Sequence, residues 1–187
     1  MALEIQPPAE LSDEVLALRL RTGDAQAGEQ LVRRHCQPLL RYLQRLVGSD
    51  QLAEELHQQA WLSVIDHLDR FDPSGAGFKA WLYRIATNKA NDLWRSKRRE
   101  KAAGEGLRLV YDGEVPESSF ALENTEQAQK LRLAIDRLPE SQKQVLLLRY
   151  YSGLKFVEIA QMLGCPLNTA LGRMHKALRR LRQLMED

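Results

Sequence analysis

The sequence predicts an all-α protein made of two helical domains that are joined by an acidic linker. Apolar residues recur every three or four positions through most of the 187 residues, and no segment shows the alternation typical of a strand. Residues 102–124 interrupt this pattern with Gly, Pro and acidic side chains. We therefore expect a loose N-terminus at residues 1–10, a first domain at 11–101, the linker at 102–124 and a second domain at 125–187.

Capping residues and glycines define the first three helices that we expect. Ser12 is an N-cap candidate for a helix that ends at Gly23. A second helix is expected over residues 25–47, before Gly48. Ser49 then caps a third helix, in which apolar residues fall every four positions and leave a polar face available.

A loop and a basic helix complete the first domain. Residues 71–79, FDPSGAGFK, concentrate Pro and Gly, so we expect a loop there and a helix that resumes at Ala80. Trp81 and Trp94 on this helix are candidates either for the core or for an exposed aromatic surface. We assign Trp81 to the buried stripe and leave the role of Trp94 open.

The second domain begins with two predicted helices. The first runs from about Thr125 to Leu138. Ser141 and Gln144 have the spacing of a capping box, which predicts the start of the next helix, and Gly153 ends it.

The remaining residues have the spacing of a helix-turn-helix. In the first helix Ala160 faces inward and is small enough for a second helix to cross closely, Gly164 supplies the turn, and Asn168 is the expected N-cap of the second helix. We expect an inward apolar stripe on that second helix: Leu171, Met174, Leu178, Leu181 and Met185. A helix with a basic outward face fits the major groove of DNA. The alternative is an amphipathic hairpin that only packs.

The net charge of +2 conceals a strongly uneven distribution. Residues 79–101 carry eight basic and two acidic side chains, and residues 128–187 carry eleven basic and five acidic ones. The acidic segment 102–127 lies between them. This arrangement indicates two surfaces that each meet a polyanion, or else two solvated helix faces.

Composition and motifs exclude several other classes of protein. A chain that is 44% apolar and 28% charged is typical of a globular protein. The longest apolar run is residues 145–148, and the N-terminus lacks a secretion signal, so we expect no membrane span and a cytoplasmic location. The two cysteines and four histidines form no ligand or catalytic pattern. We therefore expect no enzymatic activity, no cofactor and no metal site.

Two motifs, in this order, resemble those of the extracytoplasmic-function (ECF) type of bacterial RNA polymerase sigma factor. AEELHQQAWLSVIDHLDRFDPSGAGFKAWLYRIATNKANDLWRSKRR is similar to domain 2 of that family, and LPESQKQVLLLRYYSGLKFVEIAQMLGCPLNTALGRMHKALRRLRQLM is similar to domain 4. The resemblance covers residues 11–99 and 125–185. It implies a transcription initiation factor that binds core RNA polymerase and directs it to promoters through their −10 and −35 elements. A stand-alone helix-turn-helix regulator and a helical protein that sequesters a partner stay open as alternatives.

The resemblance also implies partners and site residues. The partners would be promoter DNA, the β′ clamp helices and β flap of the polymerase, and, by analogy alone, an anti-sigma factor. The clamp would contact Asp50, Glu54, Leu56, Gln58 and Gln59. The −10 element would contact the 71–79 loop and Phe78, Asn88, Lys89, Asp92, Arg95 and Arg98. The −35 element would contact Thr169, Leu171, Gly172, Arg173 and Lys176.

The sequence departs from the family pattern at two places. Gln59 replaces a carboxylate that the family usually has in its clamp-binding helix. The usual G-T-V-K-S-R entry to the recognition helix is N-T-A-L-G-R here, with Leu171 in place of a basic residue. Leu171 either packs inward, which we favour, or touches a thymine methyl group. We therefore expect weaker −35 binding or a different −35 sequence.

The linker would have to be extended to join two promoter elements that lie about 70 Å apart, because a relaxed coil of its length measures only about 28 Å. Its carboxylates suggest either that it occupies a basic channel of the polymerase or that it is an acidic tether that avoids DNA.

Overall fold

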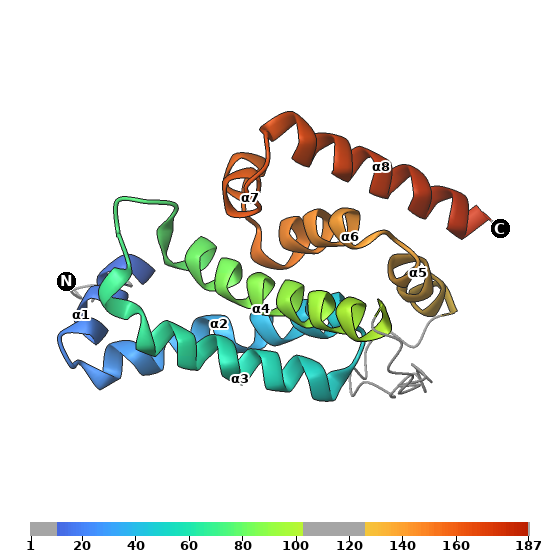
Figure 1. Cartoon of the computed structure of the whole chain (residues 1–187). Coiled ribbons are helices and arrows are strands. Elements are labelled where there is room, and N and C mark those ends of the chain that lie inside the picture. Colours follow the sequence, from blue (N-terminus) through green and yellow to red (C-terminus); the bar gives the residue numbers. More distant parts are fainter. Residues whose placement is uncertain (1–10, 103–125, 187) are drawn as a thin grey trace, which may run out of the picture.

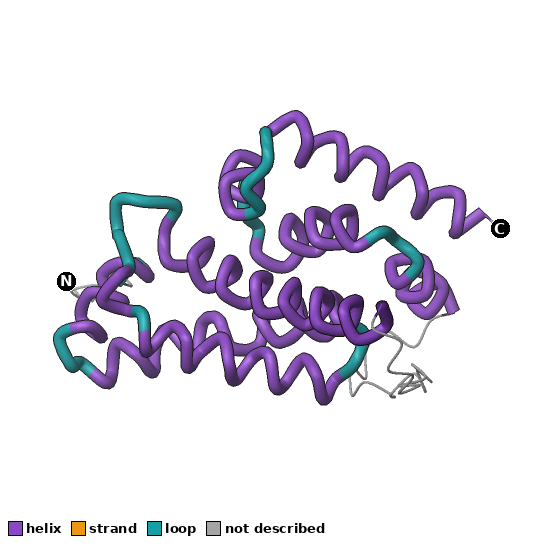
Figure 2. The backbone as a smooth tube through the Cα atoms, viewed as in Figure 1, coloured by secondary structure: helices purple, strands orange, loops and turns teal. Residues whose placement is uncertain are grey.

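The computed structural model describes residues 11–102 and 126–186, and the predicted N-terminus and nearly all of the predicted linker lie outside these ranges. Within them the chain forms eight α-helices, one 3-10 turn, one π-helical turn and no strand. The predicted all-α class is confirmed (Figures 1 and 2). The elements are α1 (Asp13–Arg21), α2 (Ala25–Val47), α3 (Asp50–Asp66), η1 (Leu68–Arg70), α4 (Gly77–Ala102), α5 (Glu126–Asp136), α6 (Glu140–Leu147), η2 (Leu148–Ser152), α7 (Phe156–Met162) and α8 (Leu167–Glu186).

Capping fixes the helix boundaries of the first half as predicted. The Ser12 hydroxyl accepts a hydrogen bond from the Val15 N–H at 3.3 Å, and the Ser49 hydroxyl accepts one from the Leu52 N–H at 3.4 Å. Gly48 ends α2 in the left-handed conformation, with φ of 70°. These contacts satisfy backbone groups that a helix end leaves without a partner.

The first half is a bundle in which α1, α2, α3 and α4 enclose one core. Tyr42 of α2 and Tyr83 of α4 are both fully buried, with ring centroids 5.2 Å apart. The Tyr42 hydroxyl shares a 2.8 Å hydrogen bond with the Thr87 hydroxyl. Because this buried polar group is satisfied, the tyrosine contributes its large apolar area at little cost.

The loop of the first half is shorter than predicted, because α4 begins at Gly77 and not at Ala80. Phe78 has no exposed area and packs against Phe71, with centroids 5.8 Å apart. Gly77 has φ of 84°, which turns the chain from the loop into the helix. The core therefore draws the first turn of α4 inward.

The second half contains the helix-turn-helix formed by α7 and α8. Gly164 has φ of 61°, as its predicted place in the turn requires. Asn168 lies inside α8, which begins at Leu167, so its prediction as N-cap was wrong by a residue or two. The capping box at Ser141 and Gln144 was also wrong. Helix α6 begins earlier, after Pro139, and the Gln144 side chain is used elsewhere.

The two halves pack directly against each other. Figure 1 shows α6 between α4 and α8. Val145 and Leu148 of the second half belong to the same core cluster as Tyr83 of the first. The Gln144 amide donates to the Asn91 Oδ1 at 2.5 Å, and the Arg98 guanidinium pairs with the Glu140 carboxylate. The structure is therefore a closed arrangement of the two halves.

None of the helices that the structure describes is long and apolar enough to cross a membrane.

Candidate nucleic-acid interface

Helix α8 presents the residues that we predicted for the −35 element. Its alanines, Ala170 and Ala177, are completely buried and let α8 lie close to α6 and α7. The predicted contacts are mostly accessible: Thr169, Leu171 and Lys176 are exposed, whereas Gly172 and Arg173 are half-buried. Arg179 and Arg180 extend the exposed basic side of the helix, which gives it the charge that phosphate contacts need.

The predicted inward stripe of α8 was partly wrong. Leu181 is buried and Met174 is half-buried, as expected, but Leu171 is 41% exposed and Leu178 is 48% exposed. The buried side is centred on Ala170 and Ala177. Residues one position further along are rotated by about 100°, so both leucines lie at the edge of the helix and not in its core. The favoured inward packing of Leu171 is thus not observed.

Helix α4 presents the predicted −10 residues, with one exception. Asn88, Asp92, Arg95 and Arg98 are exposed and Lys89 is half-buried. Arg95 pairs with Asp92 at 3.1 Å. Phe78 is the exception, because a side chain with no exposed area offers no face to a base. In this structure Phe78 is a core residue.

The two tryptophans of α4 take different positions. Trp81 is partly buried and packs against Phe71 and Phe78, with ring centroids 5.3 Å and 6.0 Å away, which fits its prediction as a core residue. Trp94 is half-buried and lines a hollow between the two halves.

The loop before α4 is anchored at both ends and exposed in the middle. Phe71 is 4% exposed, while residues 72–76 are exposed. The Asp72 Oδ1 accepts hydrogen bonds from the Ser74 N–H at 2.9 Å and the Ser74 hydroxyl at 2.7 Å. These bonds lower the pKa of the Asp72 carboxyl. The turn is therefore held in shape by its own residues, which are exposed.

A hollow of about 370 Å³ brings predicted −10 and −35 residues together. Asn88, Arg95 and Arg98 of α4 line one side, and Arg173 of α8 lines the other. Arg173 also donates to the Cys165 Sγ at 3.8 Å. In the closed arrangement, part of each predicted DNA surface faces the other half of the protein.

Helix α3 presents most of the predicted polymerase-binding residues. Glu54, Gln58 and Gln59 are exposed and Asp50 is half-buried. Leu56 is only 6% exposed and belongs to the core, so its prediction as a contact does not fit this structure.

Sequence reasoning missed two exposed apolar residues on α3. Leu62 is 60% exposed and Ile65 is 62% exposed. Leu62 lies four positions after Gln58, and Ile65 lies three positions after Leu62, so both residues continue the face of α3 that carries Gln58. The buried stripe of α3 passes through Ala60 and Val64, and Leu62 and Ile65 lie outside it. Their position relative to that stripe could have identified them as exposed from the sequence.

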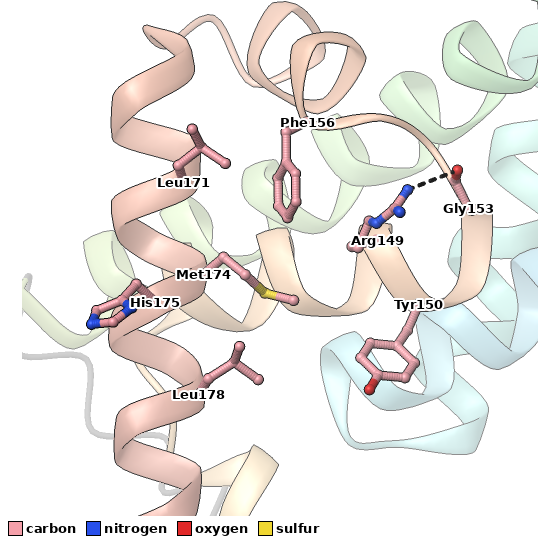
Figure 3. A pocket seen from close by; sticks show the side chains of 8 residues that line it. All are labelled: Arg149, Tyr150, Gly153, Phe156, Leu171, Met174, His175 and Leu178. Atoms are coloured by element: carbon pink, nitrogen blue, oxygen red, sulfur yellow. Dashed lines mark hydrogen bonds between the residues drawn. The ribbon is translucent and has the colours of Figure 1, made fainter.

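A second missed feature is an apolar groove on the second half, with a volume of about 720 Å³. Figure 3 shows Leu171, Met174 and Leu178 of α8 on one side of it and Phe156 and Tyr150 on the other. The Arg149 guanidinium lies 5.6 Å from the Phe156 ring centroid and donates to the Gly153 carbonyl at 3.2 Å. The exposed leucines of α8 thus form one wall of this groove.

This fold and its surfaces define a helical protein with a helix-turn-helix and a second basic surface. Residues 31–100 match the family model of sigma-70 region 2, and residues 128–181 match that of sigma-70 region 4. Helix α4 therefore lies almost entirely in the first matched region, and most of α8 lies in the second.

Several curated relatives match nearly the whole chain. The ECF RNA polymerase sigma factor SigW of Bacillus subtilis is 30% identical over 179 residues, which cover 90% of this chain and 94% of SigW. The ECF factor ShbA of Streptomyces griseus is 35% identical over 186 residues, which cover 92% and 94%. The ECF sigma-E factor of Escherichia coli is 30% identical over 178 residues, covering 90% and 91%.

Solved structures show the same fold. CnrH, in complex with the cytosolic domain of CnrY, superposes with a TM-score of 0.69 at 25% identity, covering 93% of this chain and 97% of CnrH. The sigma factor RpoE of Bartonella quintana, in complex with the anti-sigma factor NepR, gives 0.71 at 24% identity, covering 84% and 96%.

The chain belongs to the ECF group of the sigma-70 family. It is a transcription initiation factor that directs RNA polymerase to promoters. The match of both regions in the correct order favours this function over a stand-alone regulator or a sequestering protein.

Proposed function

We propose that three surfaces of this chain divide the work of initiation. The outward face of α8 binds the −35 duplex, α4 and the 71–76 loop capture the −10 element, and the exposed face of α3 binds the polymerase clamp. The observation that carries this proposal is the separation of two accessible basic helices, α4 and α8, onto different halves of the chain.

The −35 assignment follows from the shape and charge of α8. A single helix fits the major groove, and its N-terminal residues reach base edges while basic residues meet phosphates. Thr169 is exposed at this end, and Lys176 is exposed near the middle of the helix. Arg173 is the residue suited to bidentate base contact, and it becomes accessible when the halves separate.

The −10 assignment rests on an energetic limit. Opening duplex DNA costs about 1.4 kcal/mol per base-pair step, and stacking one base on an exposed aromatic side chain would return about 1–3 kcal/mol. With Phe78 buried, capture depends on the exposed loop backbone and on Asn88. The chain can therefore hold a base that has left the stack, and the polymerase supplies the remaining energy of opening.

Polymerase binding uses an apolar centre as well as polar contacts. Leu62 and Ile65 supply the centre, and Gln58 lies beside them at the adjacent turn. The apolar groove at Leu171 and Leu178 provides a second contact, suited to the β flap. The same groove could be occupied by an anti-sigma factor, as the similarity to sigma factors held in such complexes suggests.

Promoter binding requires the two halves to separate. Asn88, Arg95 and Arg98 share one hollow with Arg173, so one duplex cannot reach both sets of side chains in the closed arrangement. Binding to the polymerase would favour the open arrangement by engaging α3 and the groove on different parts of the enzyme. We assign no catalytic step to this chain and place it in the cytoplasm, where the polymerase acts.

The test is run-off transcription with core polymerase on a library of promoter fragments. We expect start-site-specific transcripts with this chain and none with core alone. Leu62→Asp should abolish co-elution with core and transcription, while Leu133→Asp, at a similarly exposed apolar residue of α5, should leave both intact. If neither association nor specific initiation is seen with the unaltered chain, the proposal is wrong.

A further inference from the structure

We propose that Glu14 is a positioning residue for −10 capture, because its carboxylate fixes the end of the 71–76 loop from a different helix. The proposal rests on the function of that loop given above. It assigns a role in promoter recognition to α1, which carries none of the predicted DNA contacts.

The contact joins the first turn of α1 to the first turn of α4. The Phe78 N–H donates a hydrogen bond to the Glu14 Oε1 at 3.2 Å. A helix leaves its first N–H groups without partners and carries positive partial charge there, so a carboxylate at this point is favourable. The first turn of α4 contains no acidic residue of its own. Glu14 therefore supplies, from 64 positions away, the anion that this helix end lacks.

Gly77 makes the approach of the carboxylate possible. Its φ of 84° is a conformation that side-chain-bearing residues rarely adopt. A Cβ atom at this position would lie 3.0 Å from the same Glu14 Oε1, which is tighter than most Cβ contacts and would require the carboxylate to shift. The turn at Gly77 and the position of the Glu14 carboxylate therefore depend on each other.

Glu14 is itself held in place by its neighbour. Asp13 accepts a hydrogen bond from the Arg34 Nη1 at 2.8 Å and makes a 2.7 Å contact with the His35 Nε2. Arg34 also donates to the Leu11 carbonyl at 2.7 Å. These contacts fasten the first turn of α1 to α2, so that Glu14 projects from a fixed support toward Gly77.

The contact with Glu14 matters because the other hydrogen bonds that shape the loop lie within the loop itself. Its turn is closed by the hydrogen bonds between Asp72 and Ser74, and its entry is anchored by buried Phe71. The polar contact of Glu14 fixes the direction in which the loop enters α4. Without it, the loop must be ordered when a base binds, and that cost weakens capture.

The test compares Glu14→Ala with Glu14→Gln, which keeps an oxygen that can accept the Phe78 N–H. Thr22→Ala is the matched control, because it removes a hydrogen bond to the Arg19 carbonyl at the opposite end of α1 and leaves the turn that carries Glu14 intact. The probe is a fork-junction DNA made from the strongest promoter recovered by run-off, whose −10 bases are single-stranded, beside a duplex that carries only the −35 element. Both are bound to reconstituted holoenzyme.

We expect Glu14→Ala to bind the fork about fivefold more weakly, the effect of losing one helix cap, and to bind the −35 duplex within about twofold of the unaltered protein. Amide exchange at residues 77–79 should accelerate in the free chain. Glu14→Gln should restore most fork binding, whereas Thr22→Ala should lower the melting temperature and leave fork binding unchanged.

Equal fork binding by Glu14→Ala and the unaltered protein would overturn the proposal, as would equal losses on fork and duplex. If the unaltered holoenzyme does not prefer the fork to the duplex, the proposed −10 function of the loop is wrong. This result differs from a failure of the Glu14 proposal, in which the unaltered holoenzyme still prefers the fork. A Glu14→Ala chain that does not fold would be replaced by Glu14→Asp, whose shorter side chain withdraws the carboxylate from the Phe78 N–H, and the proposal then requires weaker fork binding by Glu14→Asp than by Glu14→Gln.

Discussion

The contact between Asn91 and Gln144 allows a quantitative test of the closed arrangement of the two halves. Gln144 is 7% exposed, and its amide donates to the Asn91 side chain across the boundary between the halves. Asn91→Ala would leave this amide without its partner while the halves are closed. Once they separate, water can solvate it. The substitution therefore destabilises only the closed arrangement.

The size of the effect follows from the surroundings of the amide. A buried donor left without a partner costs about 1–3 kcal/mol. Gln144 also lines the 370 Å³ hollow, which water can enter, so we take the lower limit of about 1 kcal/mol. The neighbouring Arg98–Glu140 pair is exposed and contributes less than about 1 kcal/mol. Asn91→Ala should thus shift the equilibrium toward the open arrangement about fivefold.

The assay is the affinity of the free chain for a −35 duplex, measured by fluorescence anisotropy at fixed salt. The apparent affinity rises in proportion to the fraction of open chains, so we expect about a fivefold gain. Replacing both partners, as Asn91→Ala with Gln144→Leu, should reverse most of the gain, because an apolar pair leaves no orphaned amide. Gln129→Ala on α5 is the exposed control. An unchanged affinity in Asn91→Ala, or an identical gain in the double variant, would refute the reasoning.

Three further outcomes are expected. Burial raises the pKa of the Asp13 carboxyl, but the hydrogen bonds and charges of Arg34 and His35 lower it by more, so its net pKa is below 3.8. Because the pKa of Asp13 is lower in the folded chain, its ionised carboxylate stabilises the fold at pH values above 3.8, and this stabilisation is lost as the pH falls through the folded-state pKa. Asp13→Asn should therefore lower the free energy of unfolding by about 1–3 kcal/mol at pH 7. The difference in melting temperature between the variant and the unaltered protein should disappear in acid. Leu171→Lys adds a cation at the edge of α8 and should steepen the salt dependence of −35 binding by about 0.9 in log–log slope; an unchanged slope would place this residue away from phosphate. Phe78→Ala should lower the free energy of unfolding in urea by about 3–5 kcal/mol, and a chain of normal stability with impaired promoter opening would return Phe78 to the DNA surface.

Much of the fold could be predicted from local signals in the sequence. The bounds of α2, the caps at Ser12 and Ser49 and the turn at Gly164 all depend on residues within a few positions of one another. Such signals are strong because each backbone group at a helix end is satisfied by a neighbour in the chain. The candidate site was harder to predict, because the exposure of each side chain depends on residues that are distant in the sequence. The order of the motifs indicated the three surfaces, but not which of their side chains reach solvent.

Two of the wrong predictions have the same physical cause. Ser141 and Gln144 fit a capping box locally, yet Gln144 bonds to Asn91, which is 53 positions away. Phe78 was placed in a loop because of its neighbouring glycines, yet burial against Phe71 draws it into the first turn of α4. In each case a tertiary contact outweighed a local preference.

The sequence by itself determined that this chain is helical, that it carries a helix-turn-helix, and that its positive charge falls into two segments, because these properties depend on spacing and composition. Only the tertiary structure decided that the predicted −10 and −35 residues share one hollow, that Leu171 and Leu178 form the wall of a groove, and that Glu14 caps a helix remote in the sequence. Those facts depend on which helices pack together, and burial and contact between distant residues are properties of that packing.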